Sequence, residues 1–164
     1  MKRRLTVLAA FAVALASPAF AADGTWKFVV DERDHPLLTY SENGKEVFFV
    51  GCGHAFALQA KYPGPRIRKG AATITIASAQ TRMTFKGEID KPEAGVAGPR
   101  FSQIDLGYRR QDPALYGDKW HAREDRLFNL IDSGRPLRIS AEGRTYVLPP
   151  VAAPKWKARF KEIC

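Results

Sequence analysis

The sequence predicts a mainly β protein, an antiparallel β-sandwich or small barrel with one internal helix and a C-terminal helix. Apolar and polar residues alternate through most of the chain, which is the pattern of half-buried strands. The pair Asn43-Gly44 lies between two such runs, and Asn-Gly in this setting is a strong hairpin signal. Strand-rich chains of this length usually close as a sandwich or barrel, with helices on an end or an open face.

The expected strands follow the alternating runs and the turn residues between them. Glycines on both sides of Cys52 allow a bulge, or the close approach of another backbone, at the end of one strand. Near the C-terminus, Ala-Glu-Gly at 141–143 separates two short runs and predicts a second hairpin. In chain order, the expected strands cover 26–30, 38–40, 47–50, 55–59, 73–77, 82–86, 104–106, 137–140 and 145–148.

One helix is expected between the later strands. Asp118 suits its N-cap, and Gly134 followed by Pro136 is a typical helix stop. The apolar residues at helical spacing are Trp120, Leu127, Phe128 and Ile131. The two stop residues therefore separate this helix from the second hairpin.

The N-terminus has the features of a secretory signal peptide. Residues 1–4 are basic, 5–16 form an apolar run, and 17–21 end in a small-x-small cleavage site. A spanning helix needs about 20 apolar residues, so a membrane anchor is the weaker interpretation. We therefore expect a signal peptide at 1–21, a single mature domain at 22–164 without a membrane span, and a periplasmic or secreted location.

Export changes the charge and the partners to be expected. Lys2, Arg3 and Arg4 leave with the signal peptide, so 23 basic residues remain against 17 acids and the formal net charge falls from +9 to +6. An exported basic protein meets anionic envelope polymers, lipid headgroups or acidic proteins, whereas nucleic acid is not an expected partner. The alternative is that the positive charge only keeps the protein soluble.

The chain has two cysteines, Cys52 and Cys164. In an oxidising compartment an even number of cysteines predicts a disulfide. There is no Cys-x-x-Cys pair, and Cys52 with His54 supplies too few ligands for a zinc site. The alternative is a reactive thiol, because His54 at i+2 would share a strand face with Cys52 and could act as its base.

The C-terminal segment favours the disulfide. Pro154 suits a first helical turn, and Trp156, Phe160 and Ile163 then share one helix face that Cys164 extends. A helix that packs this face on the body of the protein brings its last thiol to the body as well. In the chain-entropy account, closing so long a loop stabilises the fold by about 4 to 5 kcal/mol.

Two segments interleave basic and aromatic residues and are the candidate binding sites. Aromatic faces and guanidinium groups suit sugars, phosphates and acidic partners. The alternative is that the tyrosines cover the edge of the core while the cations remain solvated. The candidate residues are Tyr62, Arg66, Arg68 and Lys69 in the first segment and Tyr108, Arg109, Arg110 and Tyr116 in the second.

The motifs of the common enzyme classes are missing. The sequence has no Gly-x-Ser-x-Gly, no His-Glu-x-x-His, no phosphate loop and no dinucleotide fingerprint, so no cofactor or metal is expected. These observations favour a non-catalytic binding module for an anionic envelope component or a protein partner. The alternative is a periplasmic thiol-dependent or hydrolytic enzyme centred on Cys52 and His54.

Three features of the chain resemble a known group of proteins. Trp26 lies near the mature start, "VFFVGC" forms a mid-chain strand, and the tail contains "YVLPP" before the last cysteine. This layout resembles small uncharacterised periplasmic proteins of Gram-negative bacteria, and it is more distantly similar to the invasion-associated locus B type of secreted β-sandwich. The resemblance implies an envelope or surface interaction protein with no catalytic motif.

Overall fold

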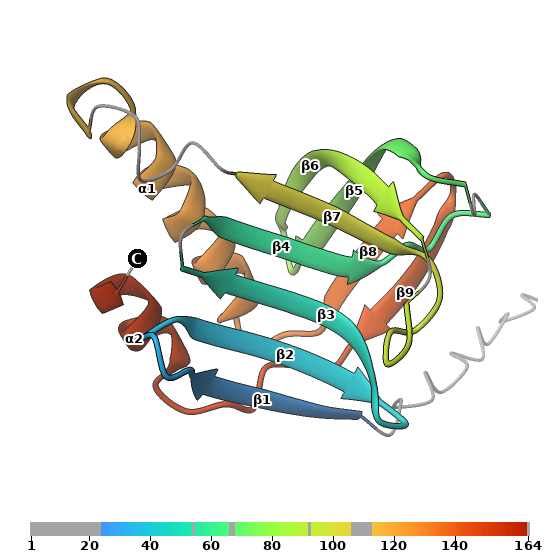
Figure 1. Cartoon of the computed structure of the whole chain (residues 1–164), viewed down its shortest axis with the longest axis horizontal. Coiled ribbons are helices and arrows are strands. Elements are labelled where there is room, and N and C mark those ends of the chain that lie inside the picture. The colour runs from blue at the N-terminus through green and yellow to red at the C-terminus, as the bar shows by residue number, and fades with distance from the viewer. Residues whose placement is uncertain (1–23, 54, 66–67, 92, 106–112, 164) are drawn as a thin grey trace, which may run out of the picture.

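A computed structural model describes residues 24–53, 55–65, 68–91, 93–105 and 113–163. Within these residues nine antiparallel strands form one sheet, in the order β1-β2-β3-β4-β7-β6-β5-β8-β9 (Figure 1). The strands are β1 (Gly24–Val30), β2 (Pro36–Glu42), β3 (Lys45–Cys52), β4 (Phe56–Lys61), β5 (Gly70–Ser78), β6 (Thr81–Asp90), β7 (Arg100–Asp105), β8 (Leu137–Ala141) and β9 (Arg144–Leu148). The helices are α1 (Pro113–Ile131) and α2 (Trp156–Ile163).

The sheet curls into a half-barrel, with β5, β6, β8 and β9 behind β4 and β7 in the view of Figure 1. The mainly β, antiparallel prediction with two helices is confirmed, and where the sequence predicted a sandwich or a small barrel the structure has one sheet curled into a half-barrel. Strand β4 pairs with β7, and β5 pairs with both β6 and β8, so hydrogen bonds continue from β1 to β9 without a break. The two edges approach one another where Trp26 Nε1 donates to the Pro149 carbonyl at 3.1 Å.

Both predicted hairpin turns are present. Asn43 and Gly44 have φ angles of 50° and 73°, and Glu142 and Gly143 have φ angles of 48° and 75°. Two successive residues in the left-handed region twist the turn in the sense that antiparallel strands require. Glycine and asparagine adopt this region at low cost, which explains why the sequence signal was specific.

The helices differ from the sequence expectation at their first residues. Helix α1 begins at Pro113, before the expected N-cap Asp118, because proline suits a first turn whose N–H groups have no intrahelical acceptor. The side chains of residues 113–121 are outside the described part of the chain. Helix α2 begins at Trp156, two residues after Pro154, and buries Trp156 and Phe160 as predicted.

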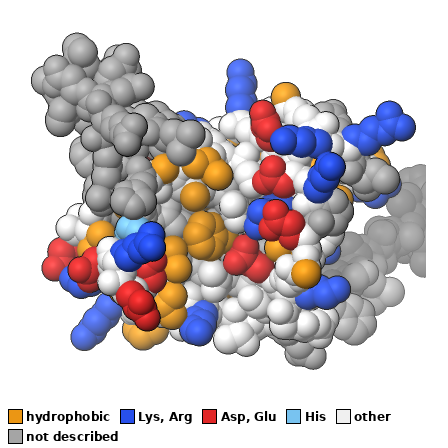
Figure 2. Space-filling model, viewed as in Figure 1, with side chains coloured by type: hydrophobic (Ala, Val, Ile, Leu, Met, Phe, Trp, Pro, Cys, Tyr) orange, Lys and Arg blue, Asp and Glu red, His pale blue; other side chains and the backbone are white. Residues whose placement is uncertain are grey.

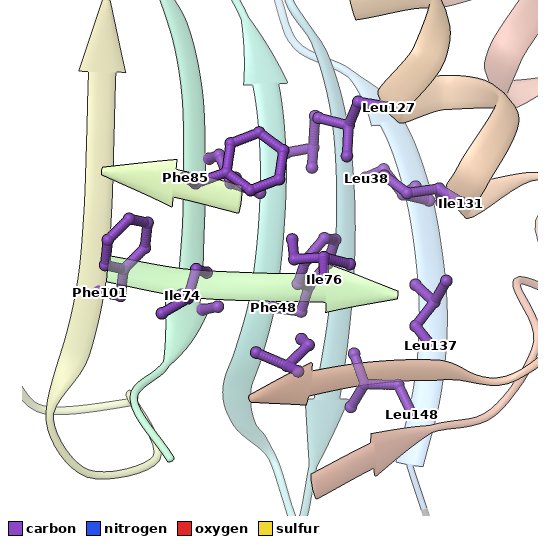
Figure 3. Packing of buried hydrophobic residues seen from close by; sticks show 14 of the residues in the cluster. Leu38, Phe48, Ile74, Ile76, Phe85, Phe101, Leu127, Ile131, Leu137 and Leu148 are labelled. Atoms are coloured by element: carbon purple, nitrogen blue, oxygen red, sulfur yellow. The ribbon is translucent and has the colours of Figure 1, made fainter. Parts of the chain in front are cut away.

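The core lies on the inner face of the sheet. We define the inner face as the one that carries the buried side chains, which alternate along each strand with outward side chains. Figure 3 shows these side chains with those of α1, where Leu127 lies beside Phe85 of β6. Phe128 of α1 joins the layers, because its ring centroid lies 6.3 Å from Phe56, 5.1 Å from Phe160 and 5.8 Å from Trp156. Helix α2 therefore packs against α1 through aromatic contacts, and its Phe160 also contacts Phe28 of β1, at 6.0 Å between ring centroids.

The outer face of β1–β4 and β7 carries an apolar row. Hydrophobic side chains gather in the middle of the view in Figure 2, with acidic and basic side chains beside them. Leu37 and Phe49 close over Gly51, where an added Cβ would lie 2.5 Å from Phe49 Cζ and 3.1 Å from Leu37 Cδ2. Ile104 is 54% exposed. The register aligns Val29, Leu37, Gly51, Ala57 and Ile104 across the five strands.

The described helices include none that is long and apolar enough to cross a membrane. Residues 1–21 lie outside the described part of the chain, so the signal peptide stays a prediction.

Candidate binding groove

A groove of about 620 Å³ lies on the outer face of β5, β6 and β8. Its wall at one end is formed by Tyr62 and by the β8–β9 turn at Glu142 and Gly143. The residues of the three strands that line it are Ala71, Ala72, Thr73, Thr75, Lys86, Gly87, Ser140 and Ala141. A space of this size is in the range of small-ligand sites.

Strand alternation places hydroxyl groups and a cation in the groove. In β5, Ile74 and Ile76 are buried in the core, so Thr73 and Thr75, which alternate with them, face outward. Thr73 pairs with Lys86 of β6, and Thr75 pairs with Ser140 of β8. Directly paired residues share one face of an antiparallel sheet. The floor of the groove therefore presents three hydroxyls and one ammonium group.

Tyr62 is buried, with 4% of its surface exposed. Its N–H donates to the Pro99 carbonyl at 2.8 Å. An added Cβ at Gly64 would lie 2.5 Å from Tyr62 Cε1 and 2.7 Å from Glu142 Oε2, so glycine allows the 62–65 loop to close against both side chains. This burial favours the interpretation that Tyr62 covers the core edge over the interpretation that it offers a free stacking face.

The first basic segment leads into the groove. Arg68 and Lys69 are exposed, and Lys69 precedes Ala71, which lines the groove, by two residues. Arg66 lies outside the described residues. The predicted binding residues Tyr108, Arg109 and Arg110 are also outside them, and so is the side chain of Tyr116. Of the predicted set, Tyr62 lines the groove, and Arg68 and Lys69 are exposed just before β5.

Strand β9 is fixed to the base of the same loop by Tyr146. Its hydroxyl donates to the Lys61 carbonyl at 2.9 Å, and Lys61 Nζ lies 5.9 Å from the centre of its ring. Burial, with a smaller contribution from the charge of Glu42, raises the pKa of Tyr146 well above its usual value. Tyr146 thus remains a neutral hydrogen-bond donor, which anchors the end of β4 where the 62–65 loop begins.

Sequence reasoning missed Thr73, Thr75, Lys86 and Ser140. Each lies at an outward position of a strand that was predicted, so alternation alone could have placed it on the solvent side. The missing information was the strand order, because β8 pairs with β5 across more than fifty intervening residues. Only that pairing brings Ser140 beside Thr75.

The rival site at Cys52 and His54 is not open to solvent at the cysteine. Cys52 lies on the inner face and is 1% exposed. Reactive thiols need access for the substrate. His54 and Cys164 lie outside the described residues, so the pairing of Cys52 with Cys164 stays a prediction.

A polar cluster under α1 is too closely packed to hold a ligand. Glu124 is buried near Gln103 and Arg123, and the Arg123 guanidinium lies 5.3 Å from the centre of the Phe85 ring. The cavity among these side chains is about 10 Å³, at the lower limit of what one water molecule needs. The cluster therefore belongs to the packing of α1.

Among the described side chains, no group of three or more histidine, cysteine, aspartate or glutamate residues could hold a metal ion. Comparisons of the chain with models of protein families, with curated proteins and with solved structures gave no match.

Proposed function

We propose that the protein is a small exported, periplasmic binding module that holds an anionic component of the cell envelope in the groove on β5, β6 and β8. The observation that carries the proposal is the lining of this groove. Three hydroxyls, from Thr73, Thr75 and Ser140, lie together with the ammonium group of Lys86, and the carboxylate of Glu142 lies at the β8–β9 turn. Exposed Arg68 and Lys69 precede the same strand.

The chemistry of this lining suits ligands with anionic oxygens and hydroxyl groups. Serine and threonine hydroxyls both donate and accept hydrogen bonds, whereas lysine and arginine only donate. Carboxylate or phosphate oxygens on a sugar or a headgroup satisfy both kinds of partner. Because the cations are exposed, each contributes at most about 1 kcal/mol, and binding weakens as salt rises.

The predicted signal peptide and the positive mature charge support an envelope location for this ligand. Peptidoglycan and anionic lipid headgroups carry the required oxygens, and an acidic protein would engage the same cations. The resemblance to small periplasmic proteins of Gram-negative bacteria agrees with this role. It adds no ligand of its own.

We further propose that Cys52 and Cys164 are joined by a disulfide that fixes α2 to the sheet. Cys164 follows Phe160 by four residues, one helical turn, so a continued helix puts both on one face. Phe160 contacts Phe128, which contacts Phe56, the register partner of Cys52. The buried position of Cys52 supports this pairing over a catalytic thiol.

Co-sedimentation with purified peptidoglycan and with anionic lipid vesicles tests the binding role. The variant combines Arg68→Gln, Lys69→Gln and Lys86→Gln and is expected to lose most of the binding at low salt. Its melting temperature should hardly change, because surface charges contribute little to stability.

The matched control removes the same charge elsewhere. Lys27→Gln, Arg33→Gln and Lys45→Gln change three exposed cations in the β1–β3 part of the chain. This control is expected to bind as the wild type does. Equal loss in both triple variants would show a nonspecific charge effect, and negligible sedimentation of the wild type would contradict the proposal.

A further inference from the structure

We propose that the ligand is an extended anionic polymer that crosses β6, β5, β8 and β9, rather than a single anionic group. This inference rests on the proposed function and names the ligand class for the same groove. It comes from the groove residues together with four residues of the outer face beyond the lining, which are Thr84, Thr145, Arg82 and Arg138.

A row of hydroxyl groups crosses these four strands. Thr75 pairs with Thr84 on one side and with Ser140 on the other, and Ser140 pairs with Thr145. The Oγ1 atoms of Thr75 and Thr84 lie 3.4 Å apart, and Ser140 Oγ lies 2.8 Å from Thr145 Oγ1. With a strand spacing of about 4.8 Å, the row is about 14 Å long. It therefore extends past the groove on both sides.

Cations flank this row on both sides. Arg82 and Arg138 both pair with Ala77, two residues along β5 from Thr75 in one direction. Lys86 pairs with Thr73, two residues away in the other direction. Two residues of an antiparallel strand span about 7 Å, so each flank lies within a Debye length of the hydroxyl row.

These three cations have no carboxylate partner among the described residues, although cations elsewhere on the surface do. Lys157 Nζ lies 3.2 Å from Asp132 Oδ2, and Lys161 Nζ lies 2.7 Å from Asp125 Oδ1. On β6 the two outward acids, Glu88 and Asp90, come after Lys86, away from the hydroxyl row. Glu142 lines the groove together with Lys86, so the positive charge that an anion meets on this face is largest at Arg82 and Arg138.

The distance between the flanks separates a polymer from a small anion. Arg82 and Lys86 are four residues apart on β6, about 14 Å along the strand. One phosphate or carboxylate group cannot contact both. A chain of linked anionic units lying on the hydroxyl row has cations on both sides, and a neutral chain would meet the hydroxyls alone.

Affinity as a function of ligand length tests the inference. Oligogalacturonates, from the monosaccharide to the octasaccharide, are titrated into the full mature protein by calorimetry, with neutral maltooligosaccharides of the same lengths as the comparison. A series of linear polyphosphates serves as a second anionic probe. We expect affinity for at least one anionic series to rise with length until the row is covered, and to stay negligible for the neutral series.

The variant Arg82→Gln with Arg138→Gln lies outside the groove lining and distinguishes the two proposals. It should bind the longest anionic oligomer about tenfold more weakly than the wild type does. Its affinity for the shortest oligomer should be unchanged. The control Lys27→Gln with Arg33→Gln removes the same charge and should bind the longest oligomer as the wild type does.

Each outcome decides the inference. If binding depends on Lys86 but neither on length nor on Arg82 and Arg138, the polymer inference is wrong while the groove proposal stands. If neither anionic series binds the wild type at low salt, the polymer inference is overturned, and the vesicle and peptidoglycan experiments decide the groove proposal separately. Equal affinity for the neutral series would overturn the anionic assignment.

Discussion

Replacing Phe128 with alanine should destabilise the protein more than most other single changes. Phe128 is 2% exposed, and its ring contacts Phe56 of β4, Trp156 and Phe160. Removing a buried phenylalanine ring costs about 3 to 5 kcal/mol, because transfer free energy is lost and a cavity remains. The whole fold is expected to have about 5 to 15 kcal/mol of stability. A fold near the middle of this range would thus keep about half of its stability or somewhat more.

The assay is equilibrium unfolding in urea followed by circular dichroism, with Asn129→Ala as the control. Asn129 is the next residue of α1 and is exposed, so its change should stay within about 0.5 kcal/mol. A loss of less than about 1 kcal/mol for Phe128→Ala would refute the reasoning, since α2 would then not depend on the aromatic cluster. A midpoint shift without a change in slope is also expected, because a change in slope reports altered compactness of the native or unfolded state.

Further tests address the disulfide, one titrating group and one turn. Alkylation without reductant should label neither Cys52 nor Cys164 in mass spectra, and labelling of both would contradict the pairing. Burial raises the pKa of Glu46, and the charge of Arg100 partly offsets this effect. The ionised side chain therefore destabilises the folded state at neutral pH, and protonation at low pH removes this destabilisation. Glu46→Gln should therefore raise the melting temperature slightly at neutral pH, with no difference from wild type below about pH 4; an unchanged difference at low pH would exclude this cause. Gly143→Ala should cost about 1 kcal/mol in urea unfolding because its φ is 75°, and a stabilised variant would show that the turn relaxes.

The strands and hairpins were predictable because their signals are local. Asn43-Gly44 and Glu142-Gly143 both adopt the left-handed backbone that such turns require. The single curled sheet was not predictable in the same way. It depends on β4 pairing with β7 and on β5 pairing with β8, and alternation within one strand contains no information about its neighbour. The same reason explains why the sequence left a sandwich and a small barrel as alternatives.

The candidate site was predictable only in part. The basic segment before β5 pointed to Arg68 and Lys69, which are exposed and precede a strand that lines the groove. Tyr62 was predicted as a binding residue because it lies among basic residues in the same segment. Its burial favours a packing role for its ring. Lys86 and Ser140 have unremarkable sequence surroundings; both line the groove, and Ser140 does so only because β5 pairs with the distant strand β8.

The most direct test of the central claim is to map where an anionic ligand contacts the protein. Amide chemical shifts are followed by NMR while an anionic oligosaccharide is titrated into the mature protein at low salt. We expect the largest shifts at Thr73, Thr75, Lys86 and Ser140, and we expect them to disappear at high salt. Shifts confined to the apolar row on β1–β4, or no shifts in β5 and β8 at saturation, would contradict the central claim.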